Sequence, residues 1–149
     1  MIVRSLDDLV GTDRDVVAET WSSRRFLLAQ DGLGYSLNDT VLHAGTTTRM
    51  HYKHHRESVY CIEGSGVLTN LETGEEHPIA PGTLYVLNEH ERHALRADTD
   101  LRMVCVFTPA LTGREVHGPD GAYPPATVDD AAAGDANDPS VSSKELAHG

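Results

Sequence analysis

The sequence lacks basic clusters: only 12 of its 149 residues are Lys or Arg, against 23 Asp or Glu, and the formal net charge is −11. A nucleic-acid partner would require a basic surface that displaces counterions, so the composition argues against DNA or RNA binding. No apolar run approaches the roughly 20 residues that span a bilayer, and the opening MIVRSLDDLVG has no signal-peptide core. We therefore expect a cytoplasmic protein with no membrane partner.

Cysteine and aromatic residues are also scarce. The two cysteines, Cys61 and Cys105, each stand in an apolar run, which favours free thiols in a reducing compartment and excludes a metal site made of cysteines alone. With one Trp and two Phe, the core must be filled mainly by Val, Leu and Ile. The length suits one domain, which we place at residues 1–125.

Short apolar segments separated by Gly, Asn, Pro or Asp make up most of this domain. Residues 16–28 (VVAETWSSRRFLL) are rich in β-branched and aromatic residues and predict one strand, and residues 1–14 suggest a first strand and then a short polar helix or loop. Later segments include YSLNDTVLHAG, ESVYCIEG, GVLTNLETGEEHPI, TLYVLNEHERHAL and DLRMVCVFTPAL. This spacing is typical of an all-β antiparallel sandwich or barrel.

The composition changes after Ala122, where large apolar residues almost disappear. Such a segment buries too little surface to offset the entropy of ordering it. We predict a disordered acidic tail at residues 126–149.

Period-two alternation predicts which side chains share a face of each strand. The predicted sets are Glu57, Val59, Cys61 and Glu63, then Thr83, Tyr85 and Leu87, then Met103, Cys105 and Phe107. If Glu57 and Tyr85 face a barrel interior, Cys105 and Phe107 become neighbours there or plain core residues.

The stretch GTTTRMHYKHHRESVYCIEG, residues 45–64, resembles the first metal motif of the cupins, which are small jelly-roll barrels of antiparallel strands. Lys53 occupies the position of a metal-binding histidine, and an ammonium has no lone pair to offer. The second motif, beginning at Gly82, supplies His93, so Glu57 and His93 are the ligand candidates. The third is Tyr85 or His51; a phenolate suits iron better than zinc.

Other histidines near these motifs have weaker claims. His54, His55 and His90 fall in turn-like stretches, where we expect solvated or hydrogen-bonded surface side chains. Glu115 and His117 stand two residues apart, so in an extended segment they point the same way and could act as an acid and a base, although such a pair is more often a surface hydrogen bond.

The chain also resembles the ectoine synthase family. The matching segments span about residues 1–125 and include MIVR, GTDRDV, WSSRR, MHYKHH, ESVYCIEG, PGTLYVL, ERHALRA, LRMVCVF and LTGREVHGPDGAYP. The resemblance implies a mononuclear iron (Fe²⁺) site and a dehydrating ring closure of N-γ-acetyl-2,4-diaminobutyrate, a small-molecule substrate, by a homodimer. It implies iron ligation by Glu57, Tyr85 and His93, substrate contacts from Trp21, Ser23, Thr40, Cys105 and Phe107, and catalytic roles for Tyr52, Glu57, Glu115 and His117.

Two other functions remain open at this point. A non-catalytic cupin could bind a small osmolyte, and a cupin iron oxygenase could use an open iron position for oxygen. The fold alone does not separate these from the lyase.

Overall fold

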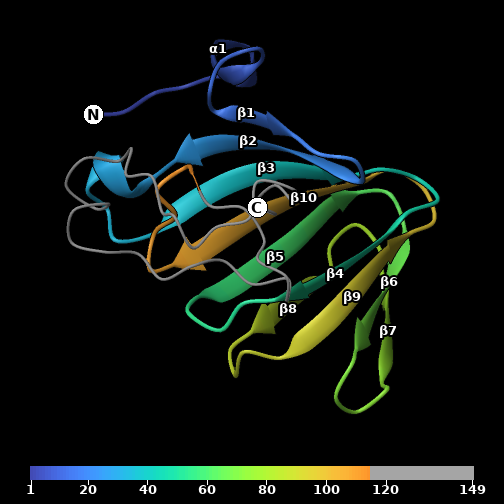
Figure 1. Ribbon diagram of the computed structural model, residues 1–149. Coiled ribbons are helices and arrows are strands. Elements are labelled where there is room, and N and C mark those ends of the chain that lie inside the picture. The colour runs from blue at the N-terminus through green and yellow to red at the C-terminus, as the bar shows by residue number, and fades with distance from the viewer. Residues whose placement is uncertain (115–149) are drawn as a thin grey trace.

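The computed structural model describes residues 1–114, which form two antiparallel β-sheets packed face to face (Figure 1). The larger sheet has the order β1-β2-β3-β10-β5-β8. Its strands are β1 (Asp15–Val17), β2 (Trp21–Leu27), β3 (Ser36–Leu42), β10 (Leu101–Thr108), β5 (Arg56–Glu63) and β8 (Leu84–Leu87). The predicted all-β fold is confirmed.

The smaller sheet has the order β4-β9-β6-β7. Its strands are β4 (Thr47–His51), β9 (Arg92–Ala97), β6 (Gly66–Asn70) and β7 (Glu76–Ile79). The helices are short: α1 (Leu6–Leu9) lies outside β1, and a single 3-10 turn, η1 (Ala29–Asp31), follows β2 (Figure 1). Within residues 1–114, no helix is long and apolar enough to cross a membrane.

The core fills the space between the sheets. Both sheets contribute to one cluster of buried apolar side chains, with Leu42, Met103 and Phe107 from the larger sheet and Met50 and Leu95 from the smaller. Strand alternation produces this arrangement, because every second side chain of a strand points to the same face. The predicted shared faces in β8 and β10 are confirmed, and both of them point inward.

The predicted shared face of β5 is wrong for its last residue, Glu63. Glu57, Val59 and Cys61 are buried, but Glu63 is exposed. Between Arg102 and Met103 of β10, the pairing with β5 shifts by one residue. Such a β-bulge places an extra residue on one strand and reverses the phase of what lies beyond it.

The start of the chain also differs from the prediction. Residues 16–28 form parts of two strands, β1 and β2, that pair as an antiparallel hairpin in which Val16 lies opposite Ser23. The connecting residues 18–20 contain none of the Gly, Pro or Asn residues that mark turns. Residues 1–14 contain α1 but no strand. The predicted tail, residues 126–149, lies outside the described residues.

Gly64 explains the last position of the first cupin motif. Its φ is +89°, in the left-handed region, and a Cβ there would collide with the backbone oxygen of Asp100. Only glycine allows this close approach between the β5–β6 turn and the start of β10.

Candidate functional site

Three polar side chains of the two motifs face the interior. Glu57 on β5 and His93 on β9 are almost fully buried, and the hydroxyl of Tyr85 on β8 is also shielded from solvent. Tyr85 lies opposite Val59, and the next inward-facing pair of the same two strands is Glu57 with Leu87. Tyr85 and His93 line one cavity of about 380 Å³. The site therefore joins the edge of the larger sheet to the smaller sheet.

The donor atoms of this site suit a metal ion. His93 Nδ1 lies 3.1 Å from the carbonyl oxygen of Glu91, so it donates there and leaves the Nε2 lone pair facing the interior. His93 Nε2 and the Tyr85 hydroxyl are buried and have no hydrogen-bond partner within residues 1–114. No group of three His, Cys, Asp or Glu side chains in this part of the chain could hold a metal. Among the described residues, Tyr85 is the candidate that would complete a three-ligand site with Glu57 and His93.

Burial keeps all three groups uncharged when no cation is present. It raises the pKa of Glu57 from 4.5 to about 8. Burial also raises the pKa of Tyr85 well above its ordinary value, and it lowers the pKa of His93 to about 4. A cation would reverse the preference of the two acids, because it compensates for the lost solvation of their anions.

A line of polar side chains crosses the larger sheet from Glu57. Cys105 on β10, between β5 and β3, is buried with Glu57 on β5 and Thr40 on β3. Thr40 Oγ1 in turn donates to Ser23 Oγ on β2 at 3.2 Å. These side chains and Trp21 are buried. The residues predicted to contact substrate thus lie on one interior face.

Aromatic rings close the other side of this interior. The ring of Tyr52 lies 5.7 Å from that of His93 and 5.2 Å, edge-on, from that of Phe107. His55 also packs edge-on against Phe107, at 6.0 Å, so the prediction that it is a surface histidine is wrong. His51 is half-buried and lies in phase with the exposed Arg49 on β4, which favours Tyr85 as the third ligand candidate.

His90 ties together the two loops that carry these groups. Its backbone has φ 60°, a left-handed conformation that is uncommon for a residue other than glycine. Nδ1 lies 2.8 Å from the carbonyl oxygen of Tyr52 and 3.2 Å from that of His55. Both partners are acceptors, so Nδ1 is the protonated nitrogen. His90 is therefore hydrogen-bonded, as predicted, and it fixes the loop that carries Tyr52.

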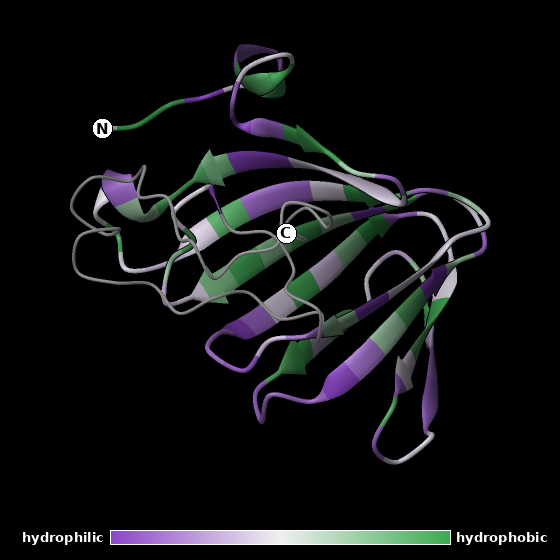
Figure 2. Ribbon diagram, in the orientation of Figure 1, coloured by the Kyte–Doolittle hydropathy of each residue, from purple (hydrophilic) through white to green (hydrophobic). Residues whose placement is uncertain are grey.

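Arg25 and Asn38 were missed in the sequence. They lie opposite each other on β2 and β3, and Figure 2 shows hydrophilic segments in both strands. Arg25 is only 1% exposed, and its guanidinium nitrogens and the Asn38 amide have no hydrogen-bond partner in the described part of the chain. An unpaired buried charge is costly, so such a group indicates an anionic ligand. The adjacent arginines of WSSRR were the available signal, because alternation sends one of them inward.

The segment after β10 returns to the same region. Leu111 accepts a hydrogen bond from the amide of Ala29 at 2.7 Å and donates one to Ser36 Oγ at 3.0 Å. This attaches the chain a few residues before Glu115. Glu115 and His117 themselves lie outside the described residues.

Comparisons with known proteins agree on one family. A family model described as Ectoine synthase matches residues 1–127. The L-ectoine synthase of Thermobifida fusca is 61% identical over 129 residues, which is 87% of this chain and 96% of the relative. That of Mycolicibacterium vanbaalenii is 55% identical over 126 residues, which is 85% of this chain and 97% of the relative.

Solved structures agree with the sequence matches. The crystal structure of ectoine synthase from P. lautus is 54% identical and superposes with a TM-score of 0.74, over 76% of this chain and 81% of that chain. A Cupin_2 domain of a transcriptional regulator from Enterobacter cloacae has a TM-score of 0.52 at 14% identity, over 60% of this chain and 97% of that one. The second likeness concerns the cupin fold alone.

Proposed function

This chain belongs to the ectoine synthase family and is a hydro-lyase, and from that premise we propose that its interior site closes the ring of ectoine beside an iron ion. The substrate is N-γ-acetyl-2,4-diaminobutyrate. Its α-amine attacks the acetamide carbonyl carbon, a C–N bond forms, the carbonyl oxygen leaves as water with both amine protons, and a C=N bond remains. The observation that carries this proposal is the buried donor set of Glu57, Tyr85 and His93, in a chain of this family.

These three residues would hold the iron. Carboxylate, phenolate and imidazole donors suit iron, and a site with three protein ligands retains open positions. Bound Fe²⁺ would act as a Lewis acid and stabilise negative charge on the acetamide oxygen, an effect worth several kcal/mol. The orientation of His93 by the carbonyl oxygen of Glu91 supports this ligand set, since metal-binding histidines usually donate their second N–H in this way.

Arg25 would anchor the carboxylate of the substrate. Its buried guanidinium is a planar fork of donors that matches a carboxylate, and Asn38 beside it can donate as well. Trp21, Ser23, Thr40, Cys105 and Phe107 would line the remaining space and hold the chain of the substrate in a folded conformation. Bringing the amine against the carbonyl carbon in this way contributes up to about 7–11 kcal/mol in ideal intramolecular reactions.

Proton transfer requires a base for the amine and an acid for the leaving oxygen. We assign these roles to Glu115 and His117, with Tyr52 as a further donor close to His93 and Phe107. An interior that excludes bulk water also protects the product, because a cyclic amidine can be reopened by hydrolysis.

We further propose a homodimer in the cytoplasm. β8 is the edge strand of the larger sheet and exposes Leu84 and Val86. Apolar Ile2 and Val3 are also exposed, near the N-terminus. Exposed apolar edges of this kind are usually covered by another chain. Free thiols at Cys61 and Cys105 suit a reducing compartment.

The test is an assay of purified protein loaded with Fe²⁺, with the acetylated diamine as substrate and ectoine as the measured product. Turnover without oxygen is expected, and a strict need for oxygen would identify an oxygenase instead. Binding of ectoine without turnover would identify an osmolyte binder. Glu57→Ala and His93→Ala should lose iron and activity together, and a fully active, iron-free Glu57→Ala would refute the assignment.

A further inference from the structure

A β-bulge in β2 lies directly after Arg25, whose side chain shares the buried face of the strand with Trp21 and Ser23. Arg25 pairs with Asn38, but Leu27 pairs with Leu37, so Phe26 is the extra residue on β2. A bulge leaves its carbonyl and amide groups without regular partners in the sheet and redirects the side chains next to it. Two arginines from the N-terminal segment bind the main chain at this point.

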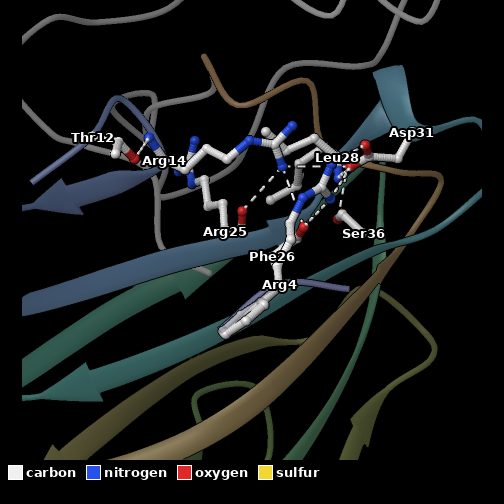
Figure 3. Close-up of polar contacts among 9 residues, drawn as sticks. Arg4, Thr12, Arg14, Arg25, Phe26, Leu28, Asp31 and Ser36 are labelled. Carbon is white, nitrogen blue, oxygen red and sulfur yellow. Dashed lines mark hydrogen bonds and ion pairs between the residues drawn. The ribbon is translucent and has the colours of Figure 1, made fainter. Parts of the chain in front are cut away.

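Arg14 holds the main chain of Arg25 from two directions. Its carbonyl oxygen accepts the amide of Arg25 at 2.8 Å, and its Nη1 donates to the carbonyl oxygens of Arg25 and Phe26, each at 3.3 Å. Arg4 Nη1 adds a bond to the Phe26 oxygen at 2.7 Å. Figure 3 shows both guanidinium groups converging on these carbonyls.

Asp31 fixes the two guanidinium groups in place. Arg4 binds its carboxylate through both terminal nitrogens, at 2.9 and 3.1 Å, and Arg14 Nη1 lies 3.5 Å away. The amide of Leu28 donates to the same carboxylate at 2.9 Å. Burial alone would raise the pKa of Asp31, but the hydrogen bonds and the two positive charges outweigh it and hold that pKa below its ordinary value. The carboxylate therefore stays charged near neutral pH.

We propose that Arg4, Arg14 and Asp31 form a clamp that positions Arg25 for the carboxylate of the substrate, an inference that rests on the anchor proposed above. Arg25 has a long side chain, and its freedom is lost only if its main chain is rigid. The clamp supplies that rigidity at the one place where the β2–β3 ladder is interrupted. Its three members are positioning residues, since none of them is placed in contact with the substrate.

The experiment compares two substrates: the acetylated diaminobutyrate and N-acetyl-1,3-diaminopropane, which lacks only the carboxylate. The quantity measured, in the iron-loaded enzyme, is kcat/KM for the acetylated diaminobutyrate divided by kcat/KM for N-acetyl-1,3-diaminopropane. Arg14→Gln should lower this ratio about tenfold or more, chiefly through KM, because a misplacement of about 1 Å can cost up to 100-fold. Arg14→Lys, with one donor group for several acceptors, should restore part of it.

Arg24→Gln is the matched control. Arg24 is the neighbour of Arg25 on β2, but it points to the other face and pairs with Asp39 at 2.7 Å. The ratio should stay within about twofold of wild type, because the Arg24 side chain does not reach the interior face that holds Arg25. A variant that is only less stable would lose activity toward both substrates equally and leave the ratio unchanged.

The outcomes separate the two proposals. If Arg25→Gln lowers the ratio but Arg14→Gln and Asp31→Asn do not, the clamp is refuted and the anchor stands. If Arg25→Gln leaves the ratio unchanged, the carboxylate anchor itself is refuted. If Arg25→Gln, Arg14→Gln and Asp31→Asn all lower it while Arg24→Gln does not, both proposals are supported.

Discussion

Replacing Arg25 by methionine should make the ligand-free protein more stable and the enzyme much worse. Methionine is unbranched and flexible, as the aliphatic part of arginine is, but it is shorter and carries no charge. In the wild type the guanidinium is buried, with no hydrogen-bond partner within residues 1–114. Folding therefore removes a charge from water without compensation from the described residues, and in the proposed function the substrate provides the counter-ion.

Both effects have an expected size. Exchanging buried ionic groups for apolar ones of similar volume often stabilises a protein by about 1–4 kcal/mol. In a chain of 149 residues, each kcal/mol raises Tm by roughly 2–4 °C. Loss of one partner of a buried charge pair costs about 2–5 kcal/mol in binding. At 1.36 kcal/mol per decade, this lowers kcat/KM by about 30- to 5,000-fold.

The assay combines thermal unfolding of the ligand-free protein with steady-state kinetics of the iron-loaded enzyme. The substrate should raise the Tm of the wild type more than that of Arg25→Met, because stabilisation by a ligand follows its affinity. Arg24→Met is the control on the opposite face. If Arg25→Met loses several degrees in Tm while kcat/KM stays within about threefold of wild type, Arg25 has a structural partner and the reasoning is refuted.

Three further predictions concern the interior. Burial raises the pKa of Glu57 from 4.5 to about 8. The contribution of Glu57 to the stability of the metal-free protein is therefore fully present below pH 4.5 and is lost as the pH rises through 8. Glu57→Gln should flatten this pH dependence of the free energy of unfolding, measured in urea. Phe107→Ala should cost about 3–5 kcal/mol in the same experiment, because it removes a fully buried ring. His90→Gly keeps the backbone conformation but removes the hydrogen bonds to the carbonyl oxygens of Tyr52 and His55. The value of kcat should therefore fall while the iron content stays the same. His90→Asn should restore much of the lost kcat.

Each of these has a matched control. Glu63→Gln changes an exposed carboxylate of the same strand and should leave the pH dependence intact. Val86→Ala, on an exposed position, should cost far less than Phe107→Ala. His54→Asn, the control for His90→Gly, changes an exposed residue in the loop that carries Tyr52 and His55. The Glu57 argument is contradicted if Glu57→Gln leaves the pH dependence unchanged. The Phe107 argument is contradicted if Phe107→Ala and Val86→Ala lower the free energy of unfolding equally. A fully active His90→Gly would contradict the role given to His90.

Local pattern predicted which side chains share a face in the three strands that carry Glu57, Tyr85 and Cys105. Alternation predicted that Cys105 and Phe107 share one face of their strand, and that they are neighbours of Glu57 and Tyr85 if those two face the interior, since successive side chains of a strand point to opposite faces. It failed at Glu63, because a bulge depends on how two strands pair and not on one of them. It also failed to divide residues 16–28, where no turn residue marks the hairpin.

The sequence by itself determined the fold class, the family and the candidate ligands, because these follow from residue types at fixed spacings along the chain. Tertiary structure alone decided that His55 is buried against Phe107, that His90 bridges two loops, and that Arg25 is buried beside a main chain bound by Arg4 and Arg14. Each of these contacts joins residues far apart in sequence. Such contacts form only when strand pairing brings distant segments together, and no local pattern encodes that pairing.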